Sequence, residues 1–499
     1  MPSLPRSLPQ ICVALALPTA AELSRAAEAE HKDGSTFFEF RLDRLREPDT
    51  GVDVIRAFRK RHPDAQVLAT CRNKQHSGGF AGGLERQLAV LTSAAKAGAI
   101  AADLEIESAE RAKAALPALR ECVPLMISYH NFQSTPALAP VLKRLQTIAS
   151  DAYKIVTMAR KPSDNLRLID FARKHHGVPL IAFAMSENGV VTRLLAPSLG
   201  APFTYACASG AAATAPGQLP ARVMRTIYRP DKVRRQSRIY GVIADPVAQS
   251  KSPLIHNRAL QARRVDGVYL PFLVAASQLG DWMKFASELP VAGFSVTRPH
   301  KQRMMRYLDV IEPLAKRIGA VNTVWRKAGR WRGTNTDTEG ARKPLSQHLR
   351  LASASVLIAG YGGAARAAAF ALADSGAKVT ITGRNMQRAH GLAQLVRGET
   401  VTLQQAEKHG YDALVNATPV GMSPKLDDCL FREHVPGEVV LDMVYDPDET
   451  LLLRRARQQG CEVIHGSEML LEQAACQFEI WTGESAPRSV MQGALAQSL

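Results

Sequence analysis

Lys154 is a charged residue inside a stretch, Tyr-Lys-Ile-Val-Thr-Met, that otherwise suits a buried strand. A buried charge is costly unless it has a partner or a chemical task. A desolvated lysine near other cations can attack a carbonyl group and form an imine. His130, one predicted strand earlier, can supply the acid and base that this chemistry requires. The alternatives are a lysine that snorkels from an edge strand and a histidine whose partners are purely structural.

Lys301 and Asp337 form a second candidate pair. Lys301 ends the run Gly-Phe-Ser-Val-Thr-Arg-Pro-His-Lys that begins at Gly293. Asp337 and Asn322 are expected on turns of the following segment. A lysine and an aspartate brought together form either a plain ion pair or a proton relay at a carbonyl or hydroxyl group.

A glycine-rich turn follows the apolar strand expected at 355–359. Gly360, Gly362 and Ala365 fit the G-x-G-x-x-G/A pattern, which lets the backbone approach a pyrophosphate at a helix N-terminus. The next strand ends before Arg384, where NAD enzymes carry an acidic residue. An arginine suits a 2′-phosphate instead, so the sequence favours NADP. The predicted cofactor residues are Gly360, Gly362, Gly363, Ala364, Ala365, Arg384, Asn385 and Thr418.

The first half must position Lys154 on a repeating strand–helix scaffold. Eight short apolar runs alternate with helical stretches over about 220 residues. Most runs are continuously apolar, as parallel strands buried on both faces should be. This pattern predicts an α/β fold with a (β/α)8 barrel, and a doubly wound sheet is the alternative. The expected strands are 11–17, 37–43, 67–72, 102–106, 125–130, 153–159, 180–185 and 203–208; the expected helices include 83–98, 138–150, 163–176 and 187–195.

A polar, basic stretch at 229–237 predicts a linker, because Pro230 cannot continue a helix that ends at Tyr228. Strand–helix alternation resumes at Ile239. Ser252 precedes a proline and is expected to cap a helix. Its hydroxyl and that of Ser250 suit a carboxylate at that helix N-terminus, or they only cap the helix.

Composition limits the remaining classes. The 499 residues predict two to four domains, and no apolar run reaches the length of a membrane span. The net charge of +17 is dispersed, which argues for a solvated surface rather than nucleic-acid binding. The seven scattered cysteines predict reduced thiols in the cytoplasm, without a disulfide frame or a zinc site, and no metal is expected. No signal peptide or transit segment is expected.

The motifs of the first half together resemble type I 3-dehydroquinate dehydratase over residues 9–228. They are Glu39-Phe-Arg-Leu-Asp43, Ser128-Tyr-His-Asn-Phe132, Tyr153-Lys-Ile155 and Ala215-Pro-Gly-Gln218. The resemblance implies that Lys154 forms the Schiff base and that His130 transfers protons. It also implies that the substrate contacts are Glu39, Arg41, Arg72, Arg193 for the carboxylate, and Thr214 and Gln218 on a closing loop at 206–220.

One position departs from this family. A glutamate that is thought to orient the catalytic histidine usually stands four residues after Arg72, and this chain has His76 there. His76 either replaces the glutamate by hydrogen bonding or is only a loop residue. The dehydratase half is therefore expected to be slow or shifted in its pH optimum.

The second half resembles shikimate dehydrogenase over 238–499. The resemblance rests on Ser250 and Ser252, Ser295-Val-Thr-Arg-Pro-His-Lys301, Asn335-Thr-Asp337, the glycine turn, Asn416-Ala-Thr-Pro-Val-Gly-Met422 and Gln473-Ala-Ala-Cys-Gln-Phe478. It implies that Lys301 and Asp337 are the catalytic pair. The implied substrate contacts are Ser250, Ser252, Thr297, Asn322 and Gln473. Tyr361 replaces an alanine of the usual glycine turn and is expected to point away from the phosphates.

Together these observations predict a barrel at 1–228, the linker at 229–237, and a two-lobed dehydrogenase-like unit. Its substrate lobe is expected at 238–343, completed by about 476–499, and its Rossmann NADP lobe at 344–475. The expected function is dehydration of 3-dehydroquinate and reduction of 3-dehydroshikimate to shikimate. The alternative is a shikimate or quinate dehydrogenase with an impaired or regulatory barrel. The sequence predicts small-molecule substrates as partners and leaves the oligomeric state open.

Overall fold

The computed structural model describes residues 2–5, 7–210 and 214–497. The chain divides into two compact units, one formed by Met1–Ser237 with Leu270–Pro290 and the other by Arg238–Tyr269 with Val291–Leu499. The substrate lobe predicted at 238–343 thus includes a segment, 270–290, that groups with the first unit.

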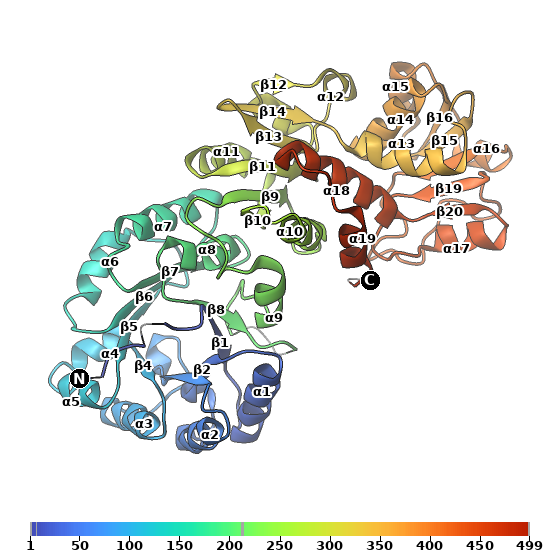
Figure 1. The fold of residues 1–499 in the computed structure, drawn as a ribbon. Helices are drawn as coiled ribbons and strands as arrows, with labels where there is room; N and C mark the ends of the chain where they lie inside the picture. The colour runs from blue at the N-terminus through green and yellow to red at the C-terminus, as the bar shows by residue number, and fades with distance from the viewer. Residues whose placement is uncertain (1, 6, 211–213, 498–499) are drawn as a thin grey trace. The chain divides into compact units, whose positions relative to one another are not determined.

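The first unit contains an eight-stranded parallel sheet in the order β7-β6-β5-β4-β3-β2-β1-β8. Sequential order of this kind is that of a barrel, whereas a doubly wound sheet reverses its order at a switch point. The two outer strands face each other, because the rings of Phe183 on β7 and Tyr205 on β8 lie 5.9 Å apart. The predicted barrel is confirmed (Figure 1). Its strands are β1 (Ile11–Leu15), β2 (Phe37–Arg41), β3 (Gln66–Thr70), β4 (Ala101–Glu105), β5 (Leu125–His130), β6 (Ala152–Met158), β7 (Leu180–Met185) and β8 (Thr204–Cys207).

Helices surround these strands (Figure 1). Because both faces of each strand are covered, the strands are apolar almost throughout, and the barrel interior is filled by side chains such as Phe37, Met126 and Phe203. The helices are α1 (Ala20–Lys32), α2 (Pro48–Arg61), α3 (Leu84–Lys96), α4 (Ile106–Arg111), α5 (Leu116–Cys122), α6 (Leu138–Leu145), α7 (Pro162–Lys174), α8 (Val190–Leu195) and α9 (Ala221–Val223). Helix α11 (Leu279–Glu288) packs on α7, where Asp281 accepts a 2.8 Å hydrogen bond from the backbone of Ser163.

Element bounds differ from the predictions mainly at the ends. Two of the eight predicted strands, 125–130 and 180–185, match β5 and β7, and the others shift by one or two residues. Helix α6 ends at Leu145, five residues earlier than predicted, since the following residues form turns. The last helical turn before Pro230 is Met224–Tyr228. The helix does not continue through Pro230 because proline has no backbone N–H to donate.

The first lobe of the second unit is built on a mixed sheet in the order β10-β9-β11-β13-β14-β12. Strands β9 and β11 run parallel, with Ile243 opposite Val296, so the loops that follow them leave the same edge of the sheet. These elements are β9 (Arg238–Ala244), α10 (Ser252–Ala262), β10 (Gly267–Leu273), β11 (Val291–Val296), β12 (Val310–Ile311), α12 (Pro313–Ile318), β13 (Thr323–Lys327) and β14 (Arg330–Thr334).

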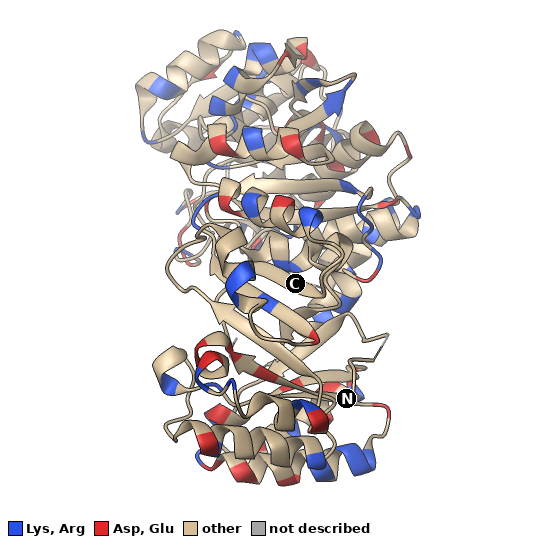
Figure 2. Ribbon diagram, turned by 90° about the vertical axis from the view of Figure 1, so that its left-hand side faces the viewer, with Lys and Arg blue, Asp and Glu red and all other residues tan. Residues whose placement is uncertain are grey.

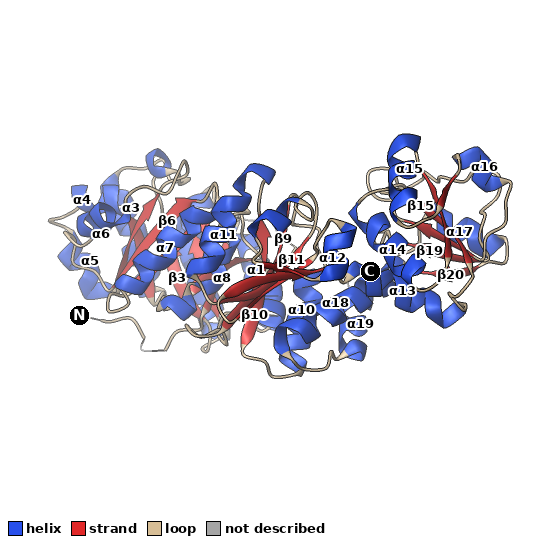
Figure 3. Ribbon diagram, turned by 90° about the horizontal axis from the view of Figure 1, so that it is seen from above, coloured by secondary structure: helices blue, strands red, loops and turns tan. Residues whose placement is uncertain are grey.

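The second lobe is a parallel sheet in the order β17-β16-β15-β18-β19-β20. Numbered from β15, this is the 3-2-1-4-5-6 order of a dinucleotide-binding fold, with its switch point between β15 and β18. The predicted Rossmann lobe is confirmed, and its strands lie between helices (Figure 3). The elements are α13 (Asp337–His348), β15 (Ser355–Ala359), α14 (Gly363–Asp374), β16 (Lys378–Thr382), α15 (Met386–Leu395), β17 (Glu399–Thr400), α16 (Leu403–Glu407), β18 (Ala413–Asn416), β19 (Val439–Asp442), α17 (Leu451–Gln458) and β20 (Glu462–Ile464). The last two helices, α18 (Gly466–Thr482) and α19 (Arg488–Ala496), return to the first lobe and contact α10.

Two surface properties bear on function. In the face drawn in Figure 2, basic and acidic residues are interspersed along the helices instead of forming one basic stripe. None of the described helices combines the length and the apolar composition that a bilayer span requires.

Candidate active sites

A cavity opens at the carboxyl ends of the barrel strands, with a volume of about 630 Å³ including its mouth. It brings together every residue predicted for the first site. They are Glu39, Arg41, Arg72, His130, Lys154, Arg193, Thr214 and Gln218. Strands β2, β5, β6, β7 and β8 contribute to the cavity directly, and the remaining lining residues come from the loops and the helix that follow strands.

Lys154 lies inside this cavity and is only 3% exposed. Its ammonium group forms an ion pair with Asp103 and lies 3.6 Å from Oε1 of Glu39. It also donates a 3.2 Å hydrogen bond to the hydroxyl of Tyr205. Burial alone would raise the pKa of Asp103, but the charges of Lys154 and Arg72 outweigh it and hold that pKa below its usual range. The buried charge of Lys154 is therefore matched by the buried carboxylate of Asp103, and Glu39 of the cavity lining lies close to it.

His130 occupies the rim of the cavity, at the end of β5. Burial, together with the positive charges of Arg72, Lys154 and Arg41, lowers the pKa of His130 well below its ordinary value. The imidazole is thus neutral at physiological pH and is able to accept a proton. Phe132 stacks against it with ring centroids 6.1 Å apart.

Arg193 is a buried cation with spare donors. Its side chain is 1% exposed, and its Nε and Nη2 atoms have no hydrogen-bond partner within the described part of the chain. Burial lowers the pKa of Arg193 to about 10. The guanidinium group lies 4.4 Å from the ring centroid of Phe183, which fixes its plane. Unpaired buried donors of this kind suit a carboxylate ligand in bidentate geometry.

Two other predicted contacts are already occupied inside the protein. Arg41 donates to both oxygens of Asp43, at 2.9 and 2.7 Å. Gln218 accepts hydrogen bonds from the backbone and hydroxyl of Thr214, both at 2.8 Å. Part of the predicted closing loop, 211–213, lies outside the described residues.

Asp103, which pairs with Lys154, and Tyr205, which lines the cavity, were not among the predicted site residues. Glu105, at the end of the same strand β4, accepts hydrogen bonds from Gln87, Ser108 and the backbone of Asn73. It serves the scaffold there. The missed signal was Asp103 itself, because a carboxylate in the middle of a buried strand is as costly as the lysine that drew attention to β6.

The second site forms around Asp337, the first residue of α13. The prediction placed Asp337 on a turn, and the helix begins at this residue instead. Asp337 pairs with Lys301 and accepts a 2.7 Å hydrogen bond from Asn322. The same amide of Asn322 lies 3.4 Å from Oε1 of Gln473. Lys301 and Asn322 therefore converge on the carboxylate of Asp337, and Gln473 adjoins Asn322.

The other predicted substrate residues lie on loops at the same edge of the sheet. Thr297 follows β11, and Ser250 precedes α10. The two loops are tied by a 3.1 Å hydrogen bond from the backbone of Asp245 to Arg298. Ser252 is not the helix cap that the sequence predicted. The N-cap position of α10 is Lys251, one residue earlier in the chain. The hydroxyl of Ser250 accepts a 3.3 Å hydrogen bond from the backbone N–H of Ser252.

The glycine turn after β15 fits a dinucleotide. Gly360 has φ +118°, and a side chain there would lie 3.1 Å from the carbonyl oxygen of Ala417. Gly362 has open space around it, at the start of α14. A Cβ on Gly363 would lie 3.4 Å from Cδ of Lys301, so the cofactor turn and the predicted catalytic lysine are neighbours. Ala364 and Ala365 follow in the first turn of α14.

Residues at the end of β16 flank this turn. Arg384 is exposed, as a residue that binds a phosphate must be before the ligand arrives. Asn385 caps α15 by accepting a 3.0 Å hydrogen bond from Arg388, a structural role that the prediction did not include. The ring of Tyr361 lies against Gly383, where an added Cβ would be 2.9 Å away. The ring of Tyr361 thus lies beside the end of β16, next to the residue that precedes Arg384.

Comparisons with known proteins agree with this geometry. Family models match type I 3-dehydroquinase at residues 11–235, the shikimate dehydrogenase substrate-binding domain at 242–324, shikimate/quinate 5-dehydrogenase at 341–420 and the shikimate 5'-dehydrogenase C-terminal domain at 466–496. The chloroplastic bifunctional 3-dehydroquinate dehydratase/shikimate dehydrogenase of Arabidopsis thaliana is 32% identical over 92% of this chain and 80% of its own. This chain belongs to the bifunctional 3-dehydroquinate dehydratase/shikimate dehydrogenase family.

Its second half has further relatives. The NADP(+) shikimate dehydrogenase of Desulforamulus reducens is 38% identical over 53% of this chain and 96% of its own. A crystal structure of a shikimate dehydrogenase in complex with NADP+ is 35% identical, with a TM-score of 0.51, and covers 53% of this chain and 97% of that one.

His76 departs from the dehydratase pattern, and the structure shows where it lies. It sits on the short helical turn Lys74–His76, and the adjacent Ser77 lines the cavity. Within the described residues, no side chain hydrogen-bonds the ring of His130. The task usually given to the glutamate, orienting that ring, is therefore unassigned in this chain.

We expect His76→Glu to raise the turnover number of the dehydratase reaction roughly tenfold, since a better-oriented base is worth about 1.4 kcal/mol. The carboxylate also favours protonated His130, so the limb of the pH–rate profile that reports this histidine should move to higher pH. His76→Gln is the matched control without charge. Unchanged rates and profiles in both variants would make His76 an ordinary loop residue.

Asp442, at the end of β19, supports the cofactor crevice and was missed by the sequence argument. It is fully buried and accepts hydrogen bonds from Asn416 at 2.9 Å and Thr450 at 2.6 Å. Asn416 in turn accepts from the hydroxyl of Thr418 at 2.8 Å, which fixes the loop after β18 at the switch point. Burial raises the pKa of Asp442 to about 6 despite these donors.

A raised pKa means that Asp442 stabilises the fold below about pH 4 and that this contribution is lost as the pH rises through about 6. Asparagine does not ionise. We therefore expect the free energy of unfolding of Asp442→Asn to increase relative to that of the parent as the pH is raised from 5 to 8. The gain is on the order of 1–2 kcal/mol, at 1.4 kcal/mol per pKa unit. Thermal unfolding of both proteins across this range measures it. A pH-independent offset would show that Asp442 does not titrate there.

Proposed function

We propose that the barrel dehydrates 3-dehydroquinate to 3-dehydroshikimate through an imine at Lys154, and that the second unit reduces this product to shikimate with NADPH. The observation that carries the first activity is a buried lysine, paired with a carboxylate, in a cavity that also holds an unpaired buried arginine. The second rests on the Lys301–Asp337 pair beside the glycine turn.

The first reaction follows from the cavity residues. Arg193 binds the substrate carboxylate and orients the ring. Lys154 first gives a proton to neutral His130, and its free amine then attacks the ketone carbon. His130 returns that proton to the hydroxyl group of the adduct, which leaves as water and gives a cationic imine that acidifies the adjacent C–H group. Neutral His130 removes that proton and returns a proton to the departing hydroxyl group, which leaves as water. Hydrolysis of the imine releases the product and regenerates the lysine. Glu39, Arg72, Thr214 and Gln218 contact the remaining hydroxyl and carboxylate oxygens, and Arg41 acts with its partner Asp43.

The second reaction follows from the converging loops. NADPH supplies the hydride when bound. Ser250, Ser252 and Thr297 hold the substrate carboxylate and ring, and Asn322 and Gln473 hold ring hydroxyl groups. Lys301 stabilises the developing alkoxide and donates its proton, while Asp337 keeps the ammonium in place. Backbone groups at Gly360–Ala365 contact the pyrophosphate, Thr418 borders the crevice, and Arg384 with Asn385 contacts the 2′-phosphate.

The proposed domains are the barrel at 1–228, the linker at 229–237, the substrate lobe at 238–343 with 476–499, and the NADP lobe at 344–475. The change of compact unit at Ser237 supports the main boundary. We also propose a cytoplasmic location and no nucleic-acid partner, supported by seven free cysteines and interspersed surface charges. A barrel kept only for binding or regulation is disfavoured by its complete set of Lys154, His130 and Arg193.

Borohydride added with 3-dehydroquinate should reduce the imine and attach the substrate covalently to Lys154. Mass spectrometry of the digested protein locates the adduct. Lys154→Met, which keeps the length of the side chain without the amine, should acquire none while still reducing 3-dehydroshikimate. An unmodified and fully active parent protein after this treatment would refute the imine.

NADPH should be preferred over NADH, and Arg384→Ala should raise the KM for NADPH by roughly 10- to 100-fold, because a charge-assisted hydrogen bond contributes about 1.5–3 kcal/mol. The KM for NADH should change little. Lys378→Ala removes an exposed cation from the opposite end of β16 and serves as the control. Equal kinetics of the parent with both cofactors would remove Arg384 from this role.

A further inference from the structure

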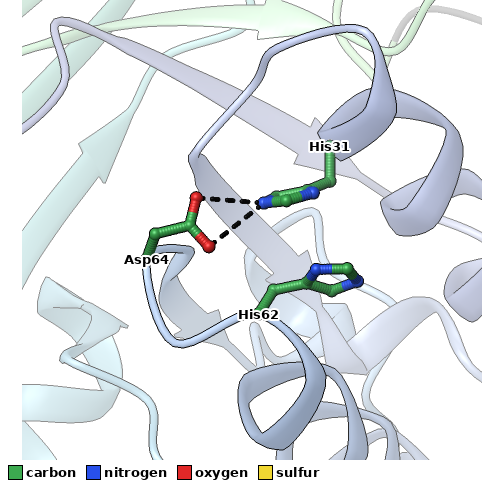
Figure 4. Close-up of side chains that lie close together, drawn as sticks. All are labelled: His31, His62 and Asp64. Carbon is green, nitrogen blue, oxygen red and sulfur yellow. Dashed lines mark hydrogen bonds and ion pairs between the residues drawn. The ribbon is translucent and has the colours of Figure 1, made fainter.

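Three side chains with metal-binding atoms meet on the barrel unit, away from its catalytic cavity. His31 lies in the last turn of α1, His62 caps the end of α2, and Asp64 follows in the loop before β3 (Figure 4). Asp64 precedes β3, whereas Arg72 of the catalytic cavity follows it. The cluster therefore sits at the amino ends of the strands, opposite the catalytic face of the barrel.

The spacing of the three side chains suits one small cation. One ligand atom from each of them lies within 4.8 Å of the others. Nε2 of His31 is 3.3 and 3.1 Å from the two oxygens of Asp64. Two ligands of a tetrahedral zinc ion, each about 2.0–2.1 Å from the metal, are themselves about 3.3 Å apart. The His31–Asp64 edge thus has the required length.

Glu28 prepares His62 for such a role. Its Oε2 atom lies 2.7 Å from Nε2 of His62, which leaves Nδ1 as the nitrogen available to a metal. Arg61 donates to the other oxygen of Glu28 at 2.7 Å and holds the carboxylate in place. A carboxylate on the distal nitrogen is the usual support of a histidine that binds metal, since it fixes the tautomer and the ring orientation.

Electrostatics at this position also favour a cation. The carboxyl ends of α1 and α2 both point here, and each carries the negative end of a helix dipole. The ring centroids of His31 and His62 lie 4.0 Å apart with the rings tilted by 35°, and the ring of Phe58 lies 4.9 Å from that of His62.

We propose that His31 Nε2, His62 Nδ1 and the Asp64 carboxylate bind a zinc ion, with water as the fourth ligand. Two imidazoles and one carboxylate form a donor set that zinc prefers. The ion links the ends of α1 and α2 to the loop that enters β3, and so stabilises the barrel without taking part in catalysis. The proposal is independent of the proposed function. The prediction of no zinc site from the sequence considered only the cysteines as ligands, so it missed these histidines and this aspartate.

The test is zinc titration of the full chain after treatment with a chelator, with a chromophoric zinc indicator as competitor. We expect one equivalent to bind with at least micromolar affinity and to raise the thermal unfolding midpoint of the barrel. His31→Gln, His62→Gln and Asp64→Asn should each weaken binding at least 100-fold. Glu28→Gln should weaken it about 10- to 100-fold, as for other residues that support a ligand.

His176→Gln changes an exposed histidine elsewhere on the barrel and should bind zinc like the parent. All variants should keep the dehydratase activity of the metal-free parent, which shows that they fold. Titration with Co²⁺ should give the visible absorption of a tetrahedral or five-coordinate N/O site in the parent and not in His62→Gln. Zinc binding that survives His31→Gln and His62→Gln, or no saturable binding by the parent, would overturn the proposal.

Discussion

The first unit is organised by the cost of burying the charge of Lys154. An ammonium group that is 3% exposed cannot be held in an apolar strand without a counter-charge. Asp103, two strands away, provides it, and Glu39 and Tyr205 complete the polar surroundings. The closed parallel sheet makes this possible, because inward positions of β2, β4, β6 and β8 face a common interior. The apolar side chains below them exclude water and keep the pair dry.

The same constraint shapes the second unit with different elements. Asp337 begins a helix, where the positive end of the dipole favours a carboxylate, and Lys301 and Asn322 satisfy its two oxygens. The glycine turn can approach this pair because Gly363 has no side chain to separate it from Lys301. Deeper in the Rossmann lobe, Asp442 supports the neighbouring loop at an energetic cost that shows in its pKa of about 6.

The fold could be predicted further than the site. Continuous apolar runs bounded by turns identify buried parallel strands, so the eight strands of the barrel and the glycine turn of the Rossmann lobe were visible in the sequence. Lys154 was visible for the same reason, as a charge where none is expected. Asp103 carried an equal signal, as a carboxylate in the middle of a buried strand, and was overlooked. Asp442 and the cluster of His31, His62 and Asp64 depend on contacts between separate segments, which residue spacing does not encode. The N-cap at Lys251 instead of Ser252 reflects the low precision of helix ends in sequence patterns.

The central claim is that one chain carries two complete active sites that share an intermediate. The direct measurement is oxidation of NADPH after addition of 3-dehydroquinate as the sole substrate. The intact chain should oxidise NADPH after a lag, as the barrel supplies dehydroshikimate to the second unit. With Lys154→Met the signal from 3-dehydroquinate should vanish, while 3-dehydroshikimate still supports NADPH oxidation at the parental rate. Continued NADPH oxidation by this variant from 3-dehydroquinate, or none by the parent, would contradict the account.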